Sequence, residues 1–136
     1  MRIEALHHVS LPVTDLRRSE EFYEQVLCLG RVPRPDFDFP GAWFGIGKTQ
    51  QLHLIVFTEQ TFRTGKALAT RDIHLAVRVG SYQDTLRFLR SKGYDENNPD
   101  DFLRLILQPK GRAGFPQIYI LDPDRHIIEI NAAVLD

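Results

Sequence analysis

The stretch LHHVSLPVTDL (residues 6–16) decides how the rest of the chain is interpreted. Apolar and polar residues alternate through residues 6–13, which is the pattern of a half-buried strand. Asp15 then stands where a helix N-cap is expected, and apolar residues recur at helical spacing up to Leu27. We therefore predict a strand over 6–13 followed by a helix that ends at Gly30, a natural helix stop.

The same order of elements occurs twice along the chain. In the first half, the proline-rich residues 31–41 indicate an irregular or edge segment, and strands are predicted at 42–47 and 50–59. In the second half, DIHLAVRV (72–79) predicts a strand, and Ser81 caps a second predicted helix. Further strands are predicted at residues 101–108, 115–121 and 126–133. This internal repeat predicts an α+β domain over 1–136 with two modules, at about 1–65 and 66–136.

Composition narrows the classes of partner. The 136 residues are 43% hydrophobic and 26% charged, which suits one globular domain with its own core. The net charge of −1 gives no electrostatic footprint for nucleic acid or anionic lipid, and no apolar run reaches the roughly 20 residues that span a bilayer. Cys28 is the one cysteine, which favours a reducing compartment, and we expect it to be a small buried side chain. We therefore expect a cytoplasmic protein whose partner is a small molecule.

Strand alternation separates a packing face from a second face in each predicted strand. In the 72–79 strand, for example, the packing face begins at Ile73. On the second face, four strands carry a side chain that binds metals: His8, His53, His74 and Glu129. Each of these residues taken singly is more often structural or exposed. Together they are costly to bury without a shared partner, and we predict that they converge on a divalent cation if the sheet curls around this face.

The segments that carry these residues resemble the vicinal oxygen chelate superfamily, and within it a glyoxalase-like subgroup. That superfamily contains lactoylglutathione lyase (glyoxalase), extradiol dioxygenases, methylmalonyl-CoA epimerase and the fosfomycin and bleomycin resistance proteins. The matching segments are LHHVSLPVTDLRRSEEFYEQVL, QLHLIV, DIHLAVRV and LDPDRHIIEIN. The resemblance implies two βαβββ modules that form a curled mixed sheet around a metal-binding cleft, and it implies a homodimer. Its metal positions fall on His8, His53, His74 and Glu129.

Three departures from the family pattern bear on the activity that the resemblance implies. The strand ligand that is usually Glu or Gln in lactoylglutathione lyases is His53 here. The arginine with which those enzymes bind the carboxylate of glutathione falls at Pro12, which argues against glutathione. The usual DPDG turn is DPDR at residues 122–125, so it lacks a glycine that tolerates positive φ.

Imidazole and carboxylate ligands suit the first-row metals Zn, Ni, Mn, Co and Fe(II). The leading prediction is a metal-dependent, glyoxalase-like lyase or isomerase whose small substrate is chelated through adjacent oxygens, with Glu129 as the catalytic general base. An extradiol-type ring-cleaving dioxygenase is the first alternative, because His8, His74 and Glu129 alone form a two-histidine, one-carboxylate triad. The second alternative is a non-enzymatic small-molecule binding or resistance protein.

Five further residues are candidates for substrate binding. Trp43 and Phe57 are expected to form an apolar wall, and Arg78 to anchor an anionic group. Gln117 and Tyr119 are expected to offer hydrogen bonds on the same face as Glu129. A structural role stays open for each of them: packing for the aromatic residues and Gln117, and ion pairing with a nearby Asp for Arg78.

Overall fold

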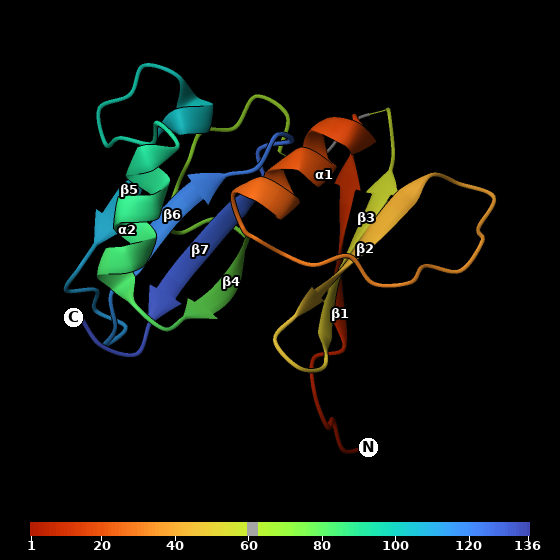
Figure 1. Ribbon diagram of the computed structural model, residues 1–136, viewed down its shortest axis with the longest axis horizontal. Helices are drawn as coiled ribbons and strands as arrows, with labels where there is room; N and C mark the ends of the chain where they lie inside the picture. The colour runs from red at the N-terminus through yellow and green to blue at the C-terminus, as the bar shows by residue number, and fades with distance from the viewer. Residues whose placement is uncertain (60–62) are drawn as a thin grey trace. The chain divides into compact units, whose positions relative to one another are not determined.

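The computed structural model describes residues 1–59 and 63–136, and the chain divides into two compact units, Met1–Phe62 and Arg63–Asp136 (Figure 1). Each unit combines one α-helix with one mixed sheet, so the α+β class predicted from the repeated order of elements is confirmed. The two sheets are separate and open. In the described part of the chain, no helix has the length and apolar character that crossing a membrane requires.

The first unit contains β1 (His8–Val13), α1 (Leu16–Gln25), β2 (Gly41–Ile46) and β3 (Gln50–Val56). The strand order is β1-β3-β2, with β1 parallel and β2 antiparallel to β3. Helix α1 lies against β2 and β3 (Figure 1). The proline-rich segment adds only an isolated bridge between Arg31 and Phe44, because prolines have no N–H to donate to a ladder. Among the described residues, this module therefore has three strands.

Helix α1 begins as the sequence predicts and ends earlier. The Asp15 side chain accepts a hydrogen bond from the Arg18 N–H at 3.1 Å, which confirms the predicted N-cap. The prediction that the helix ends at Gly30 is wrong, because its last residue is Gln25. The chain leaves the helix through Cys28, which adopts φ 54° and is exposed, so the prediction that Cys28 is buried is also wrong. The Leu29 N–H donates to the Tyr23 carbonyl at 2.9 Å, which closes the helix end without a glycine.

The second unit contains β4 (His74–Val79), α2 (Tyr82–Ser91), the 3-10 turn η1 (Asp101–Leu103), β5 (Ile106–Gln108), β6 (Gln117–Leu121) and β7 (Ile127–Ala132). The strand order is β4-β7-β6-β5, with only β4 and β7 parallel. The Ser81 side chain accepts from the Asp84 N–H at 3.0 Å, as predicted for the N-cap of α2. The strand predicted at 101–108 is shorter, because the Asp100 side chain accepts from the Phe102 N–H at 2.9 Å and starts η1 instead.

One face of the second sheet is aliphatic in every row. Its cross-strand neighbours are Leu75, Ile128 and Ile120 in one row and Val77, Ile130, Ile118 and Leu107 in the next. The four isoleucines are buried, so this side of the sheet carries an apolar layer of the core. Ile73 does not belong to it, contrary to the prediction, since β4 begins at His74 and Ile73 is 86% exposed.

The DPDR turn keeps a left-handed residue although it lacks the usual glycine. Arg125 adopts φ 67°, a conformation that costs a residue with a side chain about 1–2 kcal/mol. Its guanidinium donates to the Lys66 carbonyl at 2.8 Å and to Asp101 at 3.2 Å, and it lies 5.0 Å above the Phe102 ring. These contacts offset the strain of the turn.

Candidate functional site

Three aromatic rings stack across the three strands of the first unit. Trp43 on β2 lies flat on His53 on β3, with ring centroids 3.9 Å apart and planes 5° apart. His8 on β1 stacks on His53 at 4.2 Å and 14°. The register explains this ladder, because Trp43 is directly opposite His53, whereas His8 lies diagonally from it, two residues before Ser10. The structure therefore brings His8 and His53 together and adds Trp43 to the pair.

Hydrogen bonds determine which imidazole nitrogens of the first unit are available to a metal. His8 Nδ1 lies 2.9 Å from Nδ1 of His7, and when His8 is the donor in this bond its Nε2 has the lone pair that a metal needs. His53 Nε2 lies 2.8 Å from Oε1 of Gln51, and since a carbonyl oxygen only accepts, Nε2 carries the hydrogen. His8 therefore fits a metal ligand. His53 fits one through Nδ1, or through Nε2 after its bond to Gln51 is broken.

His53 is the buried member of the ladder. Its burial, followed by the charges of His8 and His7, lowers the pKa of His53 below its ordinary value of 6.5. The neutral imidazole is the form that binds metals, so the ladder keeps His53 in that form over a wider pH range.

The second unit brings His74 and Glu129 together. His74 Nδ1 lies 2.8 Å from the Asp72 carbonyl oxygen, and since a carbonyl oxygen only accepts, Nδ1 carries a hydrogen. The other ring nitrogen, Nε2, lies 3.3 Å from Glu129 Oε2. Two ligand atoms at about 2.1 Å from one metal stand roughly 3.0–3.4 Å apart for angles between 90° and 109°. A metal-binding histidine also usually donates its other ring N–H to a group such as a backbone carbonyl, as His74 Nδ1 does here. Both observations fit this pair to one divalent cation.

Glu129 is the centre of a buried hydrogen-bond network. Its Oε1 accepts from Asn131 Nδ2 at 2.7 Å, and its Oε2 accepts from Tyr119 Oη at 2.8 Å. Gln117 Nε2 in turn donates to Tyr119 Oη at 2.7 Å. The direction of every bond is fixed, because an ionised carboxylate only accepts. The network therefore presents Glu129 as a carboxylate of fixed orientation.

The protonation states of this network follow from burial and hydrogen bonding. Burial opposes ionisation of Glu129, which is 4% exposed, but the hydrogen bonds from Asn131 and Tyr119 outweigh it and lower the pKa of Glu129 below 4.5. Burial, followed by the hydrogen bond to Glu129, raises the pKa of Tyr119 to about 12. At neutral pH, Tyr119 is thus a donor and Glu129 an acceptor.

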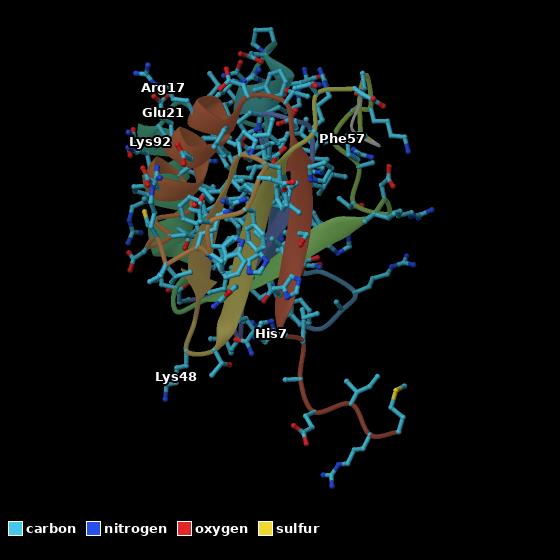
Figure 2. All side chains as sticks on the ribbon, turned by 90° about the vertical axis from the view of Figure 1, so that its right-hand side faces the viewer. His7, Arg17, Glu21, Lys48, Phe57 and Lys92 are labelled. Atoms are coloured by element: carbon cyan, nitrogen blue, oxygen red, sulfur yellow. The ribbon has the colours of Figure 1, made fainter. Side chains whose placement is uncertain are left out.

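The other candidate residues are dispersed. Phe57 follows β3 and its N–H donates to the Val13 carbonyl at 2.8 Å, at the far end of the sheet from His8. Figure 2 shows its label and that of His7 near opposite ends of the first sheet. Arg78 is exposed on β4, opposite Asn131 in the register. The roles of Trp43, Phe57, Arg78, Gln117 and Tyr119 in substrate binding stay predictions.

Two residues of these networks are not predicted from the sequence. Gln51 holds His53, and Asn131 holds Glu129. Each lies two positions from a predicted ligand on the same strand, so strand alternation places it on the same face. That spacing was the available signal, but it does not say which polar neighbour bonds to the ligand.

Each pair of predicted ligands lies within one unit. Within either unit, the described residues contain no group of three or more His, Cys, Asp or Glu side chains arranged to hold a metal. On the Glu129 face of the second sheet, Tyr119, Leu121 and Ile127 also form an apolar cluster with Leu68, Phe102 and Ile106. The convergence of all four ligands on one ion stays a prediction.

Comparisons with known proteins agree on one family. The profile described as Glyoxalase/Bleomycin resistance protein/Dioxygenase superfamily matches residues 5–95. The Arabidopsis thaliana protein named Glyoxylase I 4 is 28% identical over 135 residues, which cover 96% of this chain and 71% of that protein.

Solved structures show the same fold. A Bacillus anthracis protein assigned to the glyoxalase family superposes with a TM-score of 0.75 at 18% identity, covering 97% of both chains. A variant of the Listeria monocytogenes fosfomycin resistance protein FosX, in complex with Mn(II) and 1S,2S-dihydroxypropylphosphonic acid, superposes with a TM-score of 0.70 at 17% identity. That comparison covers 98% of this chain and 95% of FosX.

Proposed function

Because the chain belongs to the glyoxalase/bleomycin resistance protein/dioxygenase superfamily, we propose that it is a metal-dependent, glyoxalase-like lyase or isomerase. Its substrate is a small oxygenated molecule chelated through adjacent oxygens. The observation that carries the proposal is the Glu129 carboxylate, which is buried, hydrogen-bonded by Asn131 and Tyr119, and 3.3 Å from His74 Nε2. A buried carboxylate is costly unless it has such donors and a positive partner, and a divalent cation is that partner.

The proposed ligands of the ion are His8, His53, His74 and Glu129, and the candidate metals are Zn, Ni, Mn, Co and Fe(II). The 3.3 Å separation and the Asp72 carbonyl support His74 and Glu129 most strongly. The available Nε2 supports His8, whereas the bond to Gln51 makes His53 the weakest member. When bound, the ion supplies Lewis-acid polarisation of the substrate oxygens.

Glu129 is the proposed general base that removes a proton from the carbon beside the substrate carbonyl. Each carboxylate oxygen already accepts one hydrogen bond, so the proton goes to a remaining lone pair. Tyr119 stays protonated and keeps the carboxylate oriented during this transfer. The substrate is proposed to lack glutathione, because Pro12 stands where lactoylglutathione lyases have the arginine for its carboxylate.

The test is hydrogen exchange in deuterated water. Protein purified without a metal-affinity tag is loaded with each candidate metal and incubated with dihydroxyacetone or with the adduct of methylglyoxal and glutathione. We expect metal-dependent loss of the proton signal beside the carbonyl for dihydroxyacetone, and loss of that activity in Glu129→Gln. A protein that takes up no divalent ion contradicts the proposal and favours a non-enzymatic binding protein.

One observation favours a second function, an extradiol-type dioxygenase. The hydrogen bond to Gln51 withdraws Nε2 of His53, and His8, His74 and Glu129 then remain as a two-histidine, one-carboxylate set. Oxygen consumption with catechol in the Fe(II)-loaded protein distinguishes this function from the lyase. A homodimer and a cytoplasmic location complete the proposal and rest on the sequence alone.

A further inference from the structure

The Glu129 face of the second sheet carries a complete polar row, and three groups of this row are not used by the proposed function: Arg78, Gln108 and Oδ1 of Asn131. The register places Arg78 opposite Asn131, Asn131 opposite Gln117, and Gln117 opposite Gln108. The row therefore crosses all four strands in the order β4, β7, β6, β5. The neighbouring row on the same face is Ala76, Glu129, Tyr119 and Ile106. Arg78 is exposed at one end of this row, whereas Asn131 and Gln117 are buried, so the row joins the surface to the network around Glu129.

Asn131 leaves a buried acceptor without a donor. Its Nδ2 donates to Glu129 Oε1, and this fixes the orientation of the amide because the carboxylate accepts only. Its Oδ1 therefore points away from Glu129, and it is buried with no hydrogen-bond partner in the described part of the chain. Asn131 is 6% exposed, and a buried acceptor left unpaired costs about 1–3 kcal/mol. The site is thus incomplete without a donor.

Arg78 leaves a cation without an anion. Its guanidinium carbon lies 4.9 Å from the centroid of the Phe115 ring, which covers one face of the group. Within residues 63–136, no carboxylate lies within ion-pair distance of it, whereas other arginines of this unit, such as Arg87, Arg90 and Arg104, have such partners. Stacking on an aromatic ring leaves the in-plane N–H groups free for a planar, bidentate acceptor. Pairing of Arg78 with an Asp, the alternative expected from the sequence, is therefore not found within this unit.

We propose that this row binds the acid end of the substrate, a carboxylate or phosphonate with a neighbouring hydroxyl. Arg78 donates to the acid oxygens, and the hydroxyl donates to Asn131 Oδ1. The assignment of this ligand as the substrate rests on the proposed function, but its binding does not. Asn131 lies two residues beyond Glu129 on β7, about 6.7 Å along the strand, so the acid end is separated from the reacting carbon by a short spacer.

The neighbouring row supports this placement. Ala76 is the small residue opposite Glu129, so β4 carries no large side chain between His74 and Arg78 on this face. A ligand held by Arg78 therefore reaches toward Glu129 over a methyl group. A larger residue at position 76 is expected to block that path.

The test uses nuclear magnetic resonance of the 15N-labelled protein with EDTA present, so that chelation of a metal is not mistaken for binding at the row. The probes are glycolate and 2-hydroxyethylphosphonate, which carry an acid and a hydroxyl, acetate, which lacks the hydroxyl, and neutral glycolamide. We expect at least one acid-and-hydroxyl probe to shift the Arg78 Nε–H and Asn131 Nδ2 signals saturably. If glycolate alone binds, the source is a carboxylate, and if only the phosphonate binds, the source is a phosphonate.

Variants assign the binding to the row. Arg78→Gln is expected to weaken binding of the responding probe at least tenfold, and Arg78→Lys is expected to weaken it less. Arg87→Gln, which removes an exposed arginine paired with Asp84 on α2, is the matched control and is expected to bind as the wild type does. Acetate is expected to bind more weakly than glycolate, because it offers Asn131 no donor.

Several outcomes overturn this inference. They are unchanged binding in Arg78→Gln, equal shifts with glycolamide, and no shift with either acid-and-hydroxyl probe at any soluble concentration. A separate titration of metal into the wild-type protein distinguishes the two proposals. Metal uptake with no acid binding overturns the acid site alone, whereas acid binding by a protein that takes up no metal overturns the metal-dependent function alone.

Discussion

The first unit holds its two predicted ligands by ring stacking, and the second unit holds its two by hydrogen bonds. His8 and His53 share a stack with Trp43, and their nitrogens bond to His7 and Gln51. In the second unit, the Asp72 carbonyl fixes His74, while Asn131 and Tyr119 fix both oxygens of Glu129. Stacking sets the plane of a ring, whereas hydrogen bonds set which atom faces the ligand. The second unit is therefore the more preorganised half of the proposed site, because in the first unit Gln51 already occupies Nε2 of His53.

The largest expected effect compares one ligand from each unit. Glu129→Gln is expected to weaken binding of the divalent ion by more than about 100-fold, or about 2.7 kcal/mol, because it removes a fixed negative ligand. His53→Gln is expected to weaken binding by about tenfold or less, because the Gln51 bond already competes for His53. Competition with a chromophoric chelator measures both affinities. An equal loss in the two variants would contradict the difference between the units.

The next effect tests the support of the ring ladder. A Cβ at Gly41 would lie 2.4 Å from the Leu54 carbonyl oxygen, so Gly41→Ala forces β2 away from β3 and disturbs the strands that carry Trp43 and His53. We expect a loss of about 2 kcal/mol in the free energy of unfolding, measured with urea. Gly30→Ala is the control, because a Cβ there meets nothing within 4 Å. Equal stability of the two variants would show that this close approach is not required.

The same substitution at two tyrosines of the second unit is expected to act in opposite directions. Tyr119→Phe removes the donor to Glu129 and is expected to lower the free energy of unfolding by about 1 kcal/mol. Tyr82→Phe removes a buried hydroxyl that has no hydrogen-bond partner in the described part of the chain, so it is expected to be neutral or stabilising. Thermal and urea unfolding of the metal-free proteins measure both. A loss at Tyr82 as large as that at Tyr119 would count against the network.

The smallest effect separates the units by pH. In the folded protein, burial and the nearby histidines lower the pKa of His53 below 6.5. As the pH falls below 6.5, the unfolded chain therefore binds a proton at His53 before the folded protein does. The free energy of unfolding that is present above pH 6.5 decreases as a result. Burial raises the pKa of Glu129, but the hydrogen bonds from Asn131 and Tyr119 outweigh burial and lower this pKa below 4.5. The contribution of Glu129 to the free energy of unfolding is therefore present above pH 4.5 and is lost below it. Urea unfolding of the metal-free protein across this range is expected to show two declines.

A separate variant tests each of the two declines in the free energy of unfolding. His53→Gln is expected to flatten the dependence below pH 6.5, and Glu129→Gln to flatten the dependence below pH 4.5. If His53→Gln keeps the full decline between pH 6.5 and 4.5, the protonation of His53 does not cause it.

The sequence predicts the element types and which of the predicted ligands share a face within each unit, because alternation and caps are local. The Asp15 and Ser81 side chains form the predicted N-caps of the two helices. His74 and Glu129 lie on the face that alternation assigns to them. Helix α1 ends early because a backbone bond from Leu29 to Tyr23 replaces a glycine cap. That bond depends on packing and is not written in the local pattern.

The side-chain partners were also beyond the sequence. Gln51 and Asn131 bond to predicted ligands through particular rotamers, and alternation fixes only the face. Arg125 keeps the left-handed turn because Lys66, Asp101 and Phe102 hold its guanidinium. These contacts come from residues distant in the chain. The DPDR motif alone therefore does not predict that the left-handed turn is kept without glycine.

A crystal structure of the metal-loaded protein, with anomalous scattering recorded at the absorption edge of the bound metal, tests whether His74 and Glu129 bind an ion. We expect one divalent ion held by Glu129 and His74 Nε2 together with imidazole from the first unit, and we expect the Tyr119 and Asn131 hydrogen bonds to Glu129 to stay intact. An ion bound elsewhere, or Glu129 and His74 directly paired with no ion between them, would contradict it.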